Sequence, residues 1–387
     1  MVEHNNTADL FQLAELMPFN DVHFWRDPHS QLEAIIVIHS TKLGPALGGC
    51  RFVPYTSSAS AIKDALMLAK GMSYKSAIQR LPFGGGKAVI LKPDRVKNRK
   101  ALFESFGEFV ETLNGRYITA VDSGTNIEDM DVIASKTSHV ACTSTSRTNI
   151  AAASGDPSPY TAQGVYHGIR AAVQFQLKRD SLEGIHVALQ GAGHVGYQLA
   201  KLLNDDGARL SVTDLDGTAI DRVVRDFGAT AVSLEKIHTI SSDVFSPCAL
   251  GQSINRDSIE NLNTKIVAGS ANNQLQNGSI GELLLKKGIL YAPDYVINSG
   301  GMLQIAYLND VGQLNQKLAA LYDILLEIFK ASSQRQIATA SIANEMAEAV
   351  LDNGLHDTHQ PSINRKVSVQ KINCPSILSL GGYLWQR

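Results

Sequence analysis

Residues 185–196 read IHVALQGAGHVG, a short apolar run that passes directly into three glycines at the spacing GxGxxG. The apolar run predicts a strand, and the pattern after the glycines predicts a helix. At such a junction Gly191 permits a tight turn, Gly193 lets the backbone approach a pyrophosphate, and Gly196 lets the helix lie close to the strand. The free amides of the helix stabilise the anion. The junction therefore predicts a dinucleotide site.

An acidic residue follows at the distance that such a site requires. A second apolar run at 210–213 ends at Asp214, about 20 residues beyond the glycines, where a carboxylate meets the hydroxyls of the adenine ribose. A carboxylate here repels a 2′-phosphate, so we expect NAD in preference to NADP. The alternative is a glycine-rich turn in an α/β domain without a ligand. Strand, glycines, helix and acid together favour NAD.

Strands and helices alternate along the second half of the chain, which is typical of a parallel sheet with helical crossovers. The expected helices are 161–177, 195–205 and 218–227, and the expected strands are 185–190, 209–214, 243–246, 265–269 and 288–292. Residues 313–350 are mostly helical by pattern and contain neither glycine nor proline. We expect them to return to the first half of the chain.

The first half of the chain shows a second α/β pattern. A strand at 32–39 is expected to lead into a glycine-rich turn at 43–51, and further strands are expected at 88–91 and 117–121. Helices are expected at 58–77 and about 102–113, where apolar residues recur every three or four positions. Thr125 and Glu128 fit a capping box, so another helix should begin just after Asp122.

The chain is too long for one ordinary core, because single cores stop growing at about 250 to 300 residues. Residues 143–159 are rich in serine, threonine and alanine and include a glycine and two prolines, which indicates a crossover between domains. We therefore expect an α/β fold with a substrate-binding and catalytic domain at 1–147 and a doubly wound, Rossmann-type NAD-binding domain at 148–325. Helices at 326–351 should pack on the first domain, and the tail at 352–387 has no assignable pattern.

Composition excludes several classes of protein. Hydrophobic residues make up 44% of the chain and charged residues 19%, which suits a globular protein. The net charge of −2 provides no basic surface for nucleic acid, and no apolar run approaches the ~18 residues of a membrane span. The first twenty residues do not resemble a secretory signal. Four scattered cysteines without a CxxC pair argue against a disulfide framework or zinc site, so we expect a cytoplasmic location.

Two lysines and an aspartate lie at the ends of expected elements, beside glycine-rich loops. They are Lys75, Lys87 and Asp122. A lysine is most often a solvated surface residue, so either one alone is weak evidence of catalysis. Lys87 is the stronger candidate for a base, because glycines 84–86 leave room for a ligand and apolar neighbours would lower the pKa of its ammonium.

At these residues the chain resembles the family of glutamate, leucine, valine and phenylalanine dehydrogenases, and most closely its leucine and valine branch. The resemblance extends from about residue 32 to about residue 350. It is carried by LGPALGG (43–49), KGMSYK (70–75), GGGKAVI (84–90), NGRYITAVDSGTN (114–126), PCALG (247–251), AGSANNQL (268–275) and YAPDYVINSGG (291–301). It implies reversible oxidative deamination of an L-amino acid by NAD to the 2-oxo acid and ammonia.

The resemblance also implies a role for each polar side chain. Lys75 would pair with the substrate α-carboxylate, and Lys87 would be the general base on the water that attacks the imino acid. Asp122 would move protons to and from the substrate nitrogen. The implied cofactor residues are Thr161 and Asn272, on the nicotinamide carboxamide, together with Cys248 and Ala249. The implied substrate residues also include Gly48, Gly49, Asn298, Gly300 and Gly301. From sequence alone, helix capping by Thr161 and turns at Asn272 and Asn298 remain alternatives.

The expected side-chain pocket is aliphatic. Glutamate dehydrogenases carry a lysine where this chain has Leu47, so a substrate carboxylate would be buried without a partner. Ala120 stands where phenylalanine dehydrogenases more often have glycine, and with Leu47 and Ile305 it favours leucine, valine or isoleucine. Asn126 and the NSGG segment resemble the phenylalanine branch, which keeps an aromatic substrate as the alternative.

Two alternative functions and two departures from the family's sequence pattern also bear on the interpretation. A non-catalytic NAD-binding sensor would not need the three polar residues, and a 2-hydroxy-acid dehydrogenase would need a catalytic histidine; His194, within the glycine loop, is expected to face solvent. Val121 replaces a residue that is often acidic in leucine dehydrogenases, and residues 143–155 depart from the family's glycine-rich crossover. Members of the family are oligomers, so we expect a homo-oligomer, either a dimer or an octamer.

Overall fold

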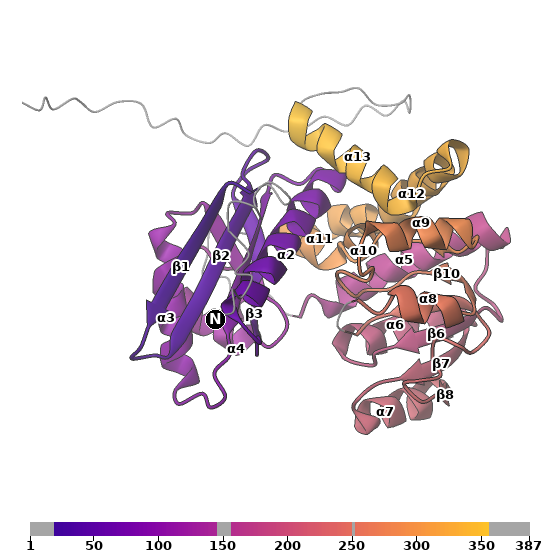
Figure 1. Ribbon diagram of the computed structural model, residues 1–387, viewed down its shortest axis with the longest axis horizontal. Helices are drawn as coiled ribbons and strands as arrows, with labels where there is room; N and C mark the ends of the chain where they lie inside the picture. Colours follow the sequence, from indigo (N-terminus) through magenta and orange to yellow (C-terminus); the bar gives the residue numbers. More distant parts are fainter. Residues whose placement is uncertain (1–18, 145–155, 250–251, 356–387) are drawn as a thin grey trace, which may run out of the picture. The chain divides into compact units, whose positions relative to one another are not determined.

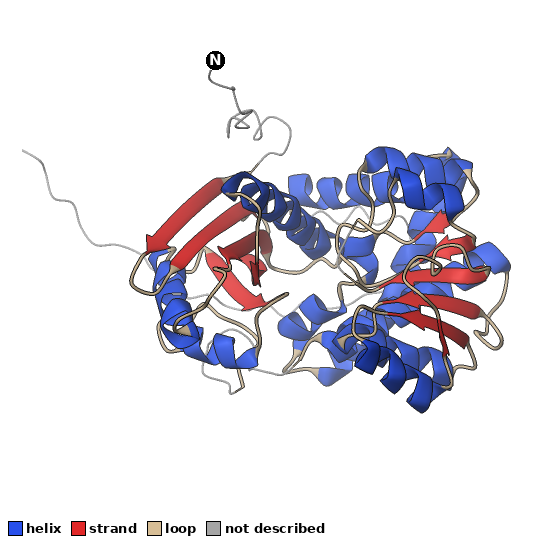
Figure 2. Ribbon diagram, turned by 60° about the horizontal axis from the view of Figure 1, so that its bottom comes forward, coloured by secondary structure: helices blue, strands red, loops and turns tan. Residues whose placement is uncertain are grey.

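The computed structural model describes residues 19–144, 156–249 and 252–355, and these described residues belong to one compact unit (Figure 1). Their strands form two separate sheets, and helices pack against both (Figure 2). The expected α/β fold is confirmed. Most of the crossover at 143–155 and most of the tail at 352–387 lie outside the described residues.

The first sheet has five strands in the order β1-β2-β4-β3-β5. They are β1 (Asp21–Asp27), β2 (Leu32–Ser40), β3 (Ala46–Val53), β4 (Gly84–Leu91) and β5 (Tyr117–Val121). Strands β1, β2 and β4 pair antiparallel, whereas β3 pairs parallel with both β4 and β5. Alternate residues of β2 face opposite layers: Ile36 packs with α3 (Arg99–Thr112) and α4 (Ile127–Ala134), and Val37 packs with α2 (Ser58–Ile78). The sheet is therefore buried on both faces.

The prediction of a glycine-rich turn at 43–51 is wrong from Ala46 onward. This segment forms β3, which lies between β4 and β5. Its glycines allow close packing of backbones: a Cβ on Gly48 would lie 1.8 Å from the carbonyl oxygen of Gly86. Glycine within a strand often marks such a close approach.

The helix after Asp122 is present, but its cap lies one residue later than predicted. Asn126 caps α4, because its side chain accepts a hydrogen bond from the amide of Asp129 at 2.9 Å, and the Asp129 carboxylate accepts one from the amide of Asn126 at 2.9 Å. The Thr125 hydroxyl accepts a hydrogen bond from the amide of Asp122 instead. Thr125 therefore closes the preceding loop.

The second sheet has six parallel strands in the order β11-β10-β9-β6-β7-β8. The strands are β6 (His186–Gln190), β7 (Arg209–Thr213), β8 (Thr230–Ala231), β9 (Ser242–Pro247), β10 (Thr264–Val267) and β11 (Leu290–Tyr291). Helix α5 (Ser158–Leu177) precedes β6, and the helices between strands are α6 (His194–Asp205), α7 (Gly217–Phe227), α8 (Arg256–Asn261) and α9 (Gly278–Lys286). The strand order reverses direction between β6 and β9, which makes the predicted doubly wound, Rossmann-like sheet.

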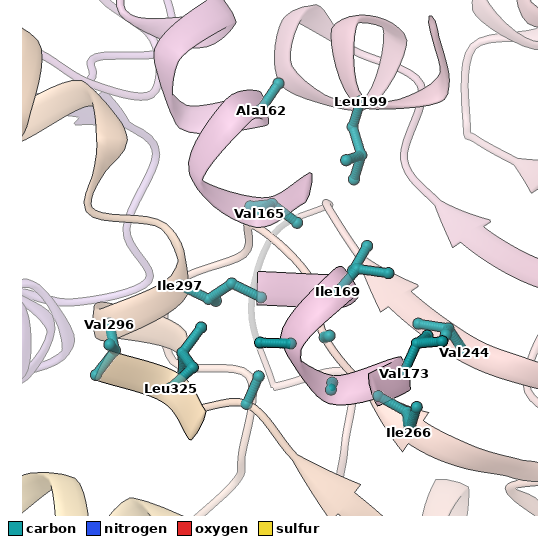
Figure 3. Close-up of a cluster of buried hydrophobic side chains, with 14 of the residues drawn as sticks. Ala162, Val165, Ile169, Val173, Leu199, Val244, Ile266, Val296, Ile297 and Leu325 are labelled. Carbon is teal, nitrogen blue, oxygen red and sulfur yellow. The ribbon is translucent and has the colours of Figure 1, made fainter. Parts of the chain in front are cut away.

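Both faces of this sheet carry apolar cores. Val187 and Leu189 of β6 face the layer of α5 and α6, whereas Ala188 between them faces α8 and α9. Figure 3 shows how Ile169 and Val173 of α5 project toward strand residues such as Val244 and Ile266. The alternation explains why the strands of this sheet are apolar throughout.

The C-terminal part is helical, as predicted. It comprises α10 (Asp294–Ile297), α11 (Gly300–Tyr307), α12 (Val311–Arg335) and α13 (Thr339–Asn353). Helix α12 packs on α5, and α13 packs on α2, where the Tyr74 hydroxyl donates a hydrogen bond to Glu348. The bounds of the expected domains remain predictions. None of the helices in the described ranges is both long and apolar enough to cross a membrane.

Candidate active site

Lys87 and Asp122 are in direct contact. The Nζ of Lys87, in β4, lies 2.7 Å from Oδ2 of Asp122, which directly follows β5. Only 5% of the lysine side chain and 14% of the aspartate side chain are exposed. This contact gives a proton a direct path between the ammonium and the carboxylate. The structure thus brings together the two residues predicted to be catalytic.

The strand register explains this contact. Strand β3 lies between the other two, with Cys50 opposite Ala88 of β4 on one side and opposite Val121 of β5 on the other. The loop after β5 is then fixed, because the Phe52 amide donates to the Ser123 carbonyl at 2.9 Å. Gly124, with a φ of +84°, comes so close to Phe52 that a Cβ would lie 1.9 Å from its carbonyl oxygen. Asp122 therefore sits in a rigid loop.

Burial and nearby charges shift the pKa values of two of the predicted residues, Asp122 and Lys75. Burial alone would raise the pKa of Asp122, but the positive charges of Lys87 and Arg51 lower it to about 2. Burial and the charge of Lys87 lower the pKa of Lys75 to about 8, against the opposing charges of Asp294 and Asp122. Lys75, in the last turn of α2, is therefore a desolvated lysine.

A small cavity of about 60 Å³ brings both lysines next to residues of the second half of the chain. Its lining comes from α2, β4, the loop after β10 and the start of α10, and consists of Leu68, Gly71, Met72, Lys75, Lys87, Asn272, Asn273, Asp294 and Tyr295. Asp294 is a partly buried carboxylate whose pKa is raised by desolvation. The predicted lysines and the predicted Asn272 therefore line the same space.

Asn298 and Asn272 are joined by a hydrogen bond. The Asn298 side-chain amide donates to Oδ1 of Asn272 at 2.7 Å and to the carbonyl of Ser270 at 3.0 Å. Asn298 is buried, and its own Oδ1 has no partner within the described part of the chain. Asn298 thus fixes the orientation of the Asn272 side chain. Turn formation, the alternative given for both residues from sequence, does not account for this hydrogen bond.

Thr161 lies in the first turn of α5, beside the glycines that begin α11. Its hydroxyl donates to the Pro157 carbonyl at 3.1 Å, and Pro157 rather than Thr161 is the cap residue of α5. A Cβ on Gly301 would lie 2.9 Å from the Thr161 hydroxyl, and one on Gly300 would lie 1.9 Å from the Tyr160 carbonyl. Helix capping therefore does not explain Thr161, and glycines 300 and 301 lie against it.

The dinucleotide junction has the geometry that NAD requires. Gly191 has a φ of +104°, and a Cβ on Gly196 would lie 2.0 Å from the Gly191 carbonyl, whereas a Cβ on Gly193 would meet nothing within 4 Å. Gly193 is also the cap of α6, so its backbone faces open space at a helix N-terminus. The Asp214 carboxylate accepts a hydrogen bond from the Ala192 amide at 2.6 Å. These residues fit a pyrophosphate and an adenine ribose.

The other predicted cofactor residues lie at the same junction. A Cβ on Gly191 would be 2.7 Å from the Ala249 amide nitrogen and 2.8 Å from the Cys248 carbonyl carbon. The Cys248 amide donates to the Gln190 carbonyl at 2.7 Å. The side chain of His194 is 83% exposed, as expected for a residue facing solvent.

The residues of the expected side-chain pocket are apolar; Leu47 and Ala120 are buried and Ile305 is partly buried. Leu47 is fully buried with Leu303, and Ile305 packs against the same cluster. Ile305 also packs against the cluster that contains Ala120, which pairs with Gly49 across β3 and β5. Ile305 therefore connects Leu47 and Ala120, and none of the three provides a charge.

Two charged residues near the site were not predicted. Arg51 donates to Asp122, and Asp294 lines the cavity of the lysines. Both lie in or next to segments that carry the family resemblance. Neither was predicted, because the residues near each of them in the site, Asp122 for Arg51 and the two lysines for Asp294, are distant in sequence. Within the described ranges, no group of three or more histidine, cysteine, aspartate or glutamate side chains is placed to hold a metal ion.

Comparison with known proteins gives two family matches and several close relatives. Residues 20–139 match the Glu/Leu/Phe/Val dehydrogenase dimerisation domain, and residues 218–319 match the Glutamate/Leucine/Phenylalanine/Valine dehydrogenase domain. Leucine dehydrogenase of Thermoactinomyces intermedius is 45% identical over 344 residues, 88% of this chain and 92% of that protein. Phenylalanine dehydrogenase of Caldalkalibacillus thermarum is 41% identical over 351 residues, 89% of this chain and 93% of that protein.

A solved structure agrees with these matches. The crystal structure of L-tryptophan dehydrogenase from Nostoc punctiforme superposes with a TM-score of 0.71 at 38% identity, covering 89% of this chain and 98% of that one. The similarity to this structure and to the relatives' sequences covers both sheets of the present chain. The chain therefore belongs to the glutamate/leucine/phenylalanine/valine dehydrogenase family of NAD-dependent amino-acid dehydrogenases.

Proposed function

We propose that the protein catalyses the reversible oxidative deamination of a branched-chain aliphatic L-amino acid: leucine, valine or isoleucine. The amino acid, NAD⁺ and water give the 2-oxo acid, ammonium, NADH and a proton. The observation that carries this proposal is the buried contact of Lys87 with Asp122 beside Lys75, in a site whose nearby Leu47 is apolar and fully buried. Proton-transferring groups and an uncharged pocket together suit this reaction.

Each of the three polar residues has a part in the proposed reaction. Below about pH 8, Lys75 carries the positive charge that pairs with the substrate α-carboxylate and orients the α-carbon. Lys87 takes the proton of the water that adds to the imino carbon. Asp122, ionised beside it, accepts a proton from the substrate nitrogen and returns one when ammonia leaves.

The cofactor side of the proposal uses residues at the second sheet. The backbone at Gly191, Gly193 and Gly196 would hold the pyrophosphate and Asp214 the adenine ribose, while Thr161 and Asn272 would bind the nicotinamide carboxamide. NAD supplies the hydride acceptor. The hydrogen bond from Asn298 supports this arrangement, because it fixes the amide of Asn272 on the side where the lysines lie.

An aromatic substrate is the second candidate. Phenylalanine dehydrogenase and tryptophan dehydrogenase resemble this chain nearly as closely as leucine dehydrogenase does. The preference for an aliphatic chain rests on Leu47, Ala120 and Ile305, and a single methyl in such a pocket changes the binding free energy by only about 1 to 3 kcal/mol. Relative rates with aliphatic and aromatic amino acids distinguish the two candidates.

The first experiment is the absorbance of NADH formed from NAD⁺ with L-leucine, L-valine, L-isoleucine, L-phenylalanine, L-tryptophan and L-glutamate. We expect the highest kcat/KM with an aliphatic substrate. A preference for phenylalanine or tryptophan would replace the aliphatic proposal with the aromatic one. Absence of NADH in every reaction would favour the non-catalytic sensor.

The variant Lys87→Met tests the proposed base. We expect kcat to fall by about 10²-fold or more, because proton transfer to a positioned group is lost, while NADH still binds in a fluorescence titration. Lys100→Met is the matched control, since the Lys100 side chain is 74% exposed on α3. An undiminished kcat in Lys87→Met would contradict the mechanism.

We also propose that the protein works as a homo-oligomer, either a dimer or an octamer. Support comes from residues 20–139, which match a domain described as a dimerisation domain. Light scattering of the purified protein gives the mass directly. A monomer at assay concentration would contradict this part of the proposal.

A further inference from the structure

Arg51 lies between two carboxylates in the first sheet. Its Nε donates to Oδ2 of Asp122 at 3.1 Å, and its Nη1 donates to Oδ2 of Asp64 at 2.9 Å. The Arg51 side chain is only 12% exposed. The Tyr55 hydroxyl donates to the same oxygen of Asp64 at 2.7 Å. A continuous series of polar contacts therefore runs from Tyr55 through Asp64 and Arg51 to Asp122 and its partner Lys87.

These residues come from rigid elements. Arg51 is in β3, between the strand of Lys87 and the strand that Asp122 follows, and Asp64 lies near the start of α2. Helix α2 is fixed there by a capping box between Ser57 and Ser60. A guanidinium held by two carboxylates in this way has little freedom, because its planar fork matches fixed acceptor positions.

In the proposed mechanism Asp122 loses the positive charge of Lys87 during part of the cycle. When Lys87 acts as a base it must pass through its uncharged form, and Asp122 then loses the positive charge 2.7 Å away. Burial without a counter-ion favours the protonated form of a carboxylic acid. Asp122 would then hold its own proton and could not accept one from the substrate nitrogen. A second cation on Asp122 prevents this only if it keeps its charge throughout the cycle.

We propose that Arg51 is a positioning residue that keeps Asp122 ionised and in place while Lys87 gives up and regains its proton. An arginine side chain is not deprotonated in proteins, so its charge does not vary during turnover. Asp64 and Tyr55 in turn hold the guanidinium against Asp122. This inference rests on the proposed function only for the effect on turnover, because the ionisation of Asp122 is measurable without it.

The other groups near Asp122 do not replace Arg51. Besides Lys87, Arg51 and Tyr55, the charge of Asp122 acts on three ionisable side chains. These are Lys75 of α2, Cys50 of β3 and Tyr117 of β5. Burial raises the pKa of Cys50 to about 12 and raises that of Tyr117 well above its usual value, so both are neutral. Lys75 has a pKa of about 8 and is committed to the substrate carboxylate in the proposed mechanism. Arg51 is therefore the permanent cation among them.

The test compares Arg51→Gln, Arg51→Lys and the wild type. Glutamine keeps a hydrogen-bond donor but removes the charge, whereas lysine keeps the charge without the planar fork. Arg26→Met is the matched control, because the Arg26 side chain is 74% exposed and pairs with Glu33. In each full-length protein the Asp122 carboxyl is titrated by ¹³C NMR with carboxyl-labelled aspartate, and its signal is identified by its loss in Asp122→Asn. The pH profiles of kcat and KM are measured alongside.

We expect Arg51→Gln to raise the pH at which Asp122 titrates and to lower kcat by at least about tenfold with a smaller change in KM. Arg51→Lys should restore the titration of Asp122 most of the way to that of the wild type. Arg26→Met should behave as the wild type. A residue that only supports the fold would lower the melting temperature without moving the titration of Asp122.

Arg51→Gln with the wild-type titration of Asp122 would overturn the proposal, whatever its activity. Should Arg51→Gln not fold, Asp64→Asn decides, because it removes the outer anchor of Arg51 and leaves both partners of Asp122 in place. A fall in kcat of about tenfold in Asp64→Asn supports the proposal, and an unchanged kcat overturns it. If the wild type forms no NADH, the proposed function fails, and the titration of Asp122 in Arg51→Gln still decides on Arg51: a raised value supports the proposal and the wild-type value overturns it.

Discussion

Asp122 links the chemistry of single residues to the stability of the protein. Its pKa is lowered from 3.8 to about 2, so the ionised form stabilises the folded state above pH ~4, and this stabilisation is lost as the pH falls toward ~2. The shift corresponds to on the order of 2 kcal/mol. We predict a steeper loss of unfolding free energy between about pH 4 and pH 2 for the wild type than for Asp122→Asn, measured by urea unfolding. Equal slopes in the two proteins would contradict the assigned ion pairs.

Asp214 tests the coenzyme assignment. Its two carboxylate oxygens accept hydrogen bonds from the amides of Ala192 and Asp216, which places a negative charge at the edge of the glycine loop. We predict that Asp214→Asn raises the ratio of kcat/KM for NADP to that for NAD by at least about tenfold, an effect of roughly 1.4 kcal/mol, because the charge that repels a 2′-phosphate is removed. Asp205→Asn, on the exposed side of α6, is the control. An unchanged ratio would exclude the ribose role of Asp214.

At the scale of elements, the close packing of β3 is the feature most sensitive to substitution. A Cβ at position 48 would lie 1.8 Å from the backbone of β4, whereas a Cβ at Gly71 in α2 would meet nothing within 4 Å. We predict that Gly48→Ala destabilises the protein by about 2 kcal/mol or more, and that Gly71→Ala stabilises it by up to about 1 kcal/mol. Thermal unfolding measures both. A Gly48→Ala protein as stable as the wild type would show that β3 and β4 can move apart.

The elements differ in how well the sequence predicts them. Most of the second sheet follows from sequence, because β6, β7, β9, β10 and β11 are short apolar runs, a local pattern. The two-residue strand β8 and the helices α8 and α9 were not predicted. Strands β1 and β3 were missed for opposite reasons: β1 mixes charged and aromatic residues at the edge of the sheet, and β3 contains glycines that look like a turn. The need for glycine at Gly48 arises from the adjacent backbone of Gly86, which no local pattern contains.

Some residues of the candidate site were predicted from sequence and others were not. Lys75, Lys87, Asp122 and the glycines of the dinucleotide junction were found because each lies within a recognisable segment, and their assigned roles remain predictions. Arg51 was not found, although it directly follows Cys50 in the glycine-rich strand. Its partners Asp64 and Asp122 lie 13 and 71 residues away, so its significance depends on the pairing of β3 with its neighbours.

At the scale of the whole molecule, the compact unit ends at Leu355, and every candidate site residue precedes that point. We predict that a chain ending at Leu355 keeps the melting temperature and the kcat of the full chain. A chain ending at Gln336 is the contrasting variant, because it lacks α13 and leaves α2 without the partner of Tyr74, and it should be less stable. Loss of activity on removal of residues 356–387 alone would assign those residues a part in the reaction.

The contact between α2 and α13 also has a consequence for the order in which the protein is made. Tyr74, one residue before Lys75, is hydrogen bonded to Glu348, which follows it by 274 residues. At translation rates of ~5 to 20 residues per second, the ribosome needs roughly 15 to 55 s to synthesise that interval. Throughout this time α2 is complete but lacks its final neighbour. The helix that carries Lys75 therefore gains this neighbour only after residue 348 has been synthesised, so the surroundings of Lys75 are completed long after α2 itself.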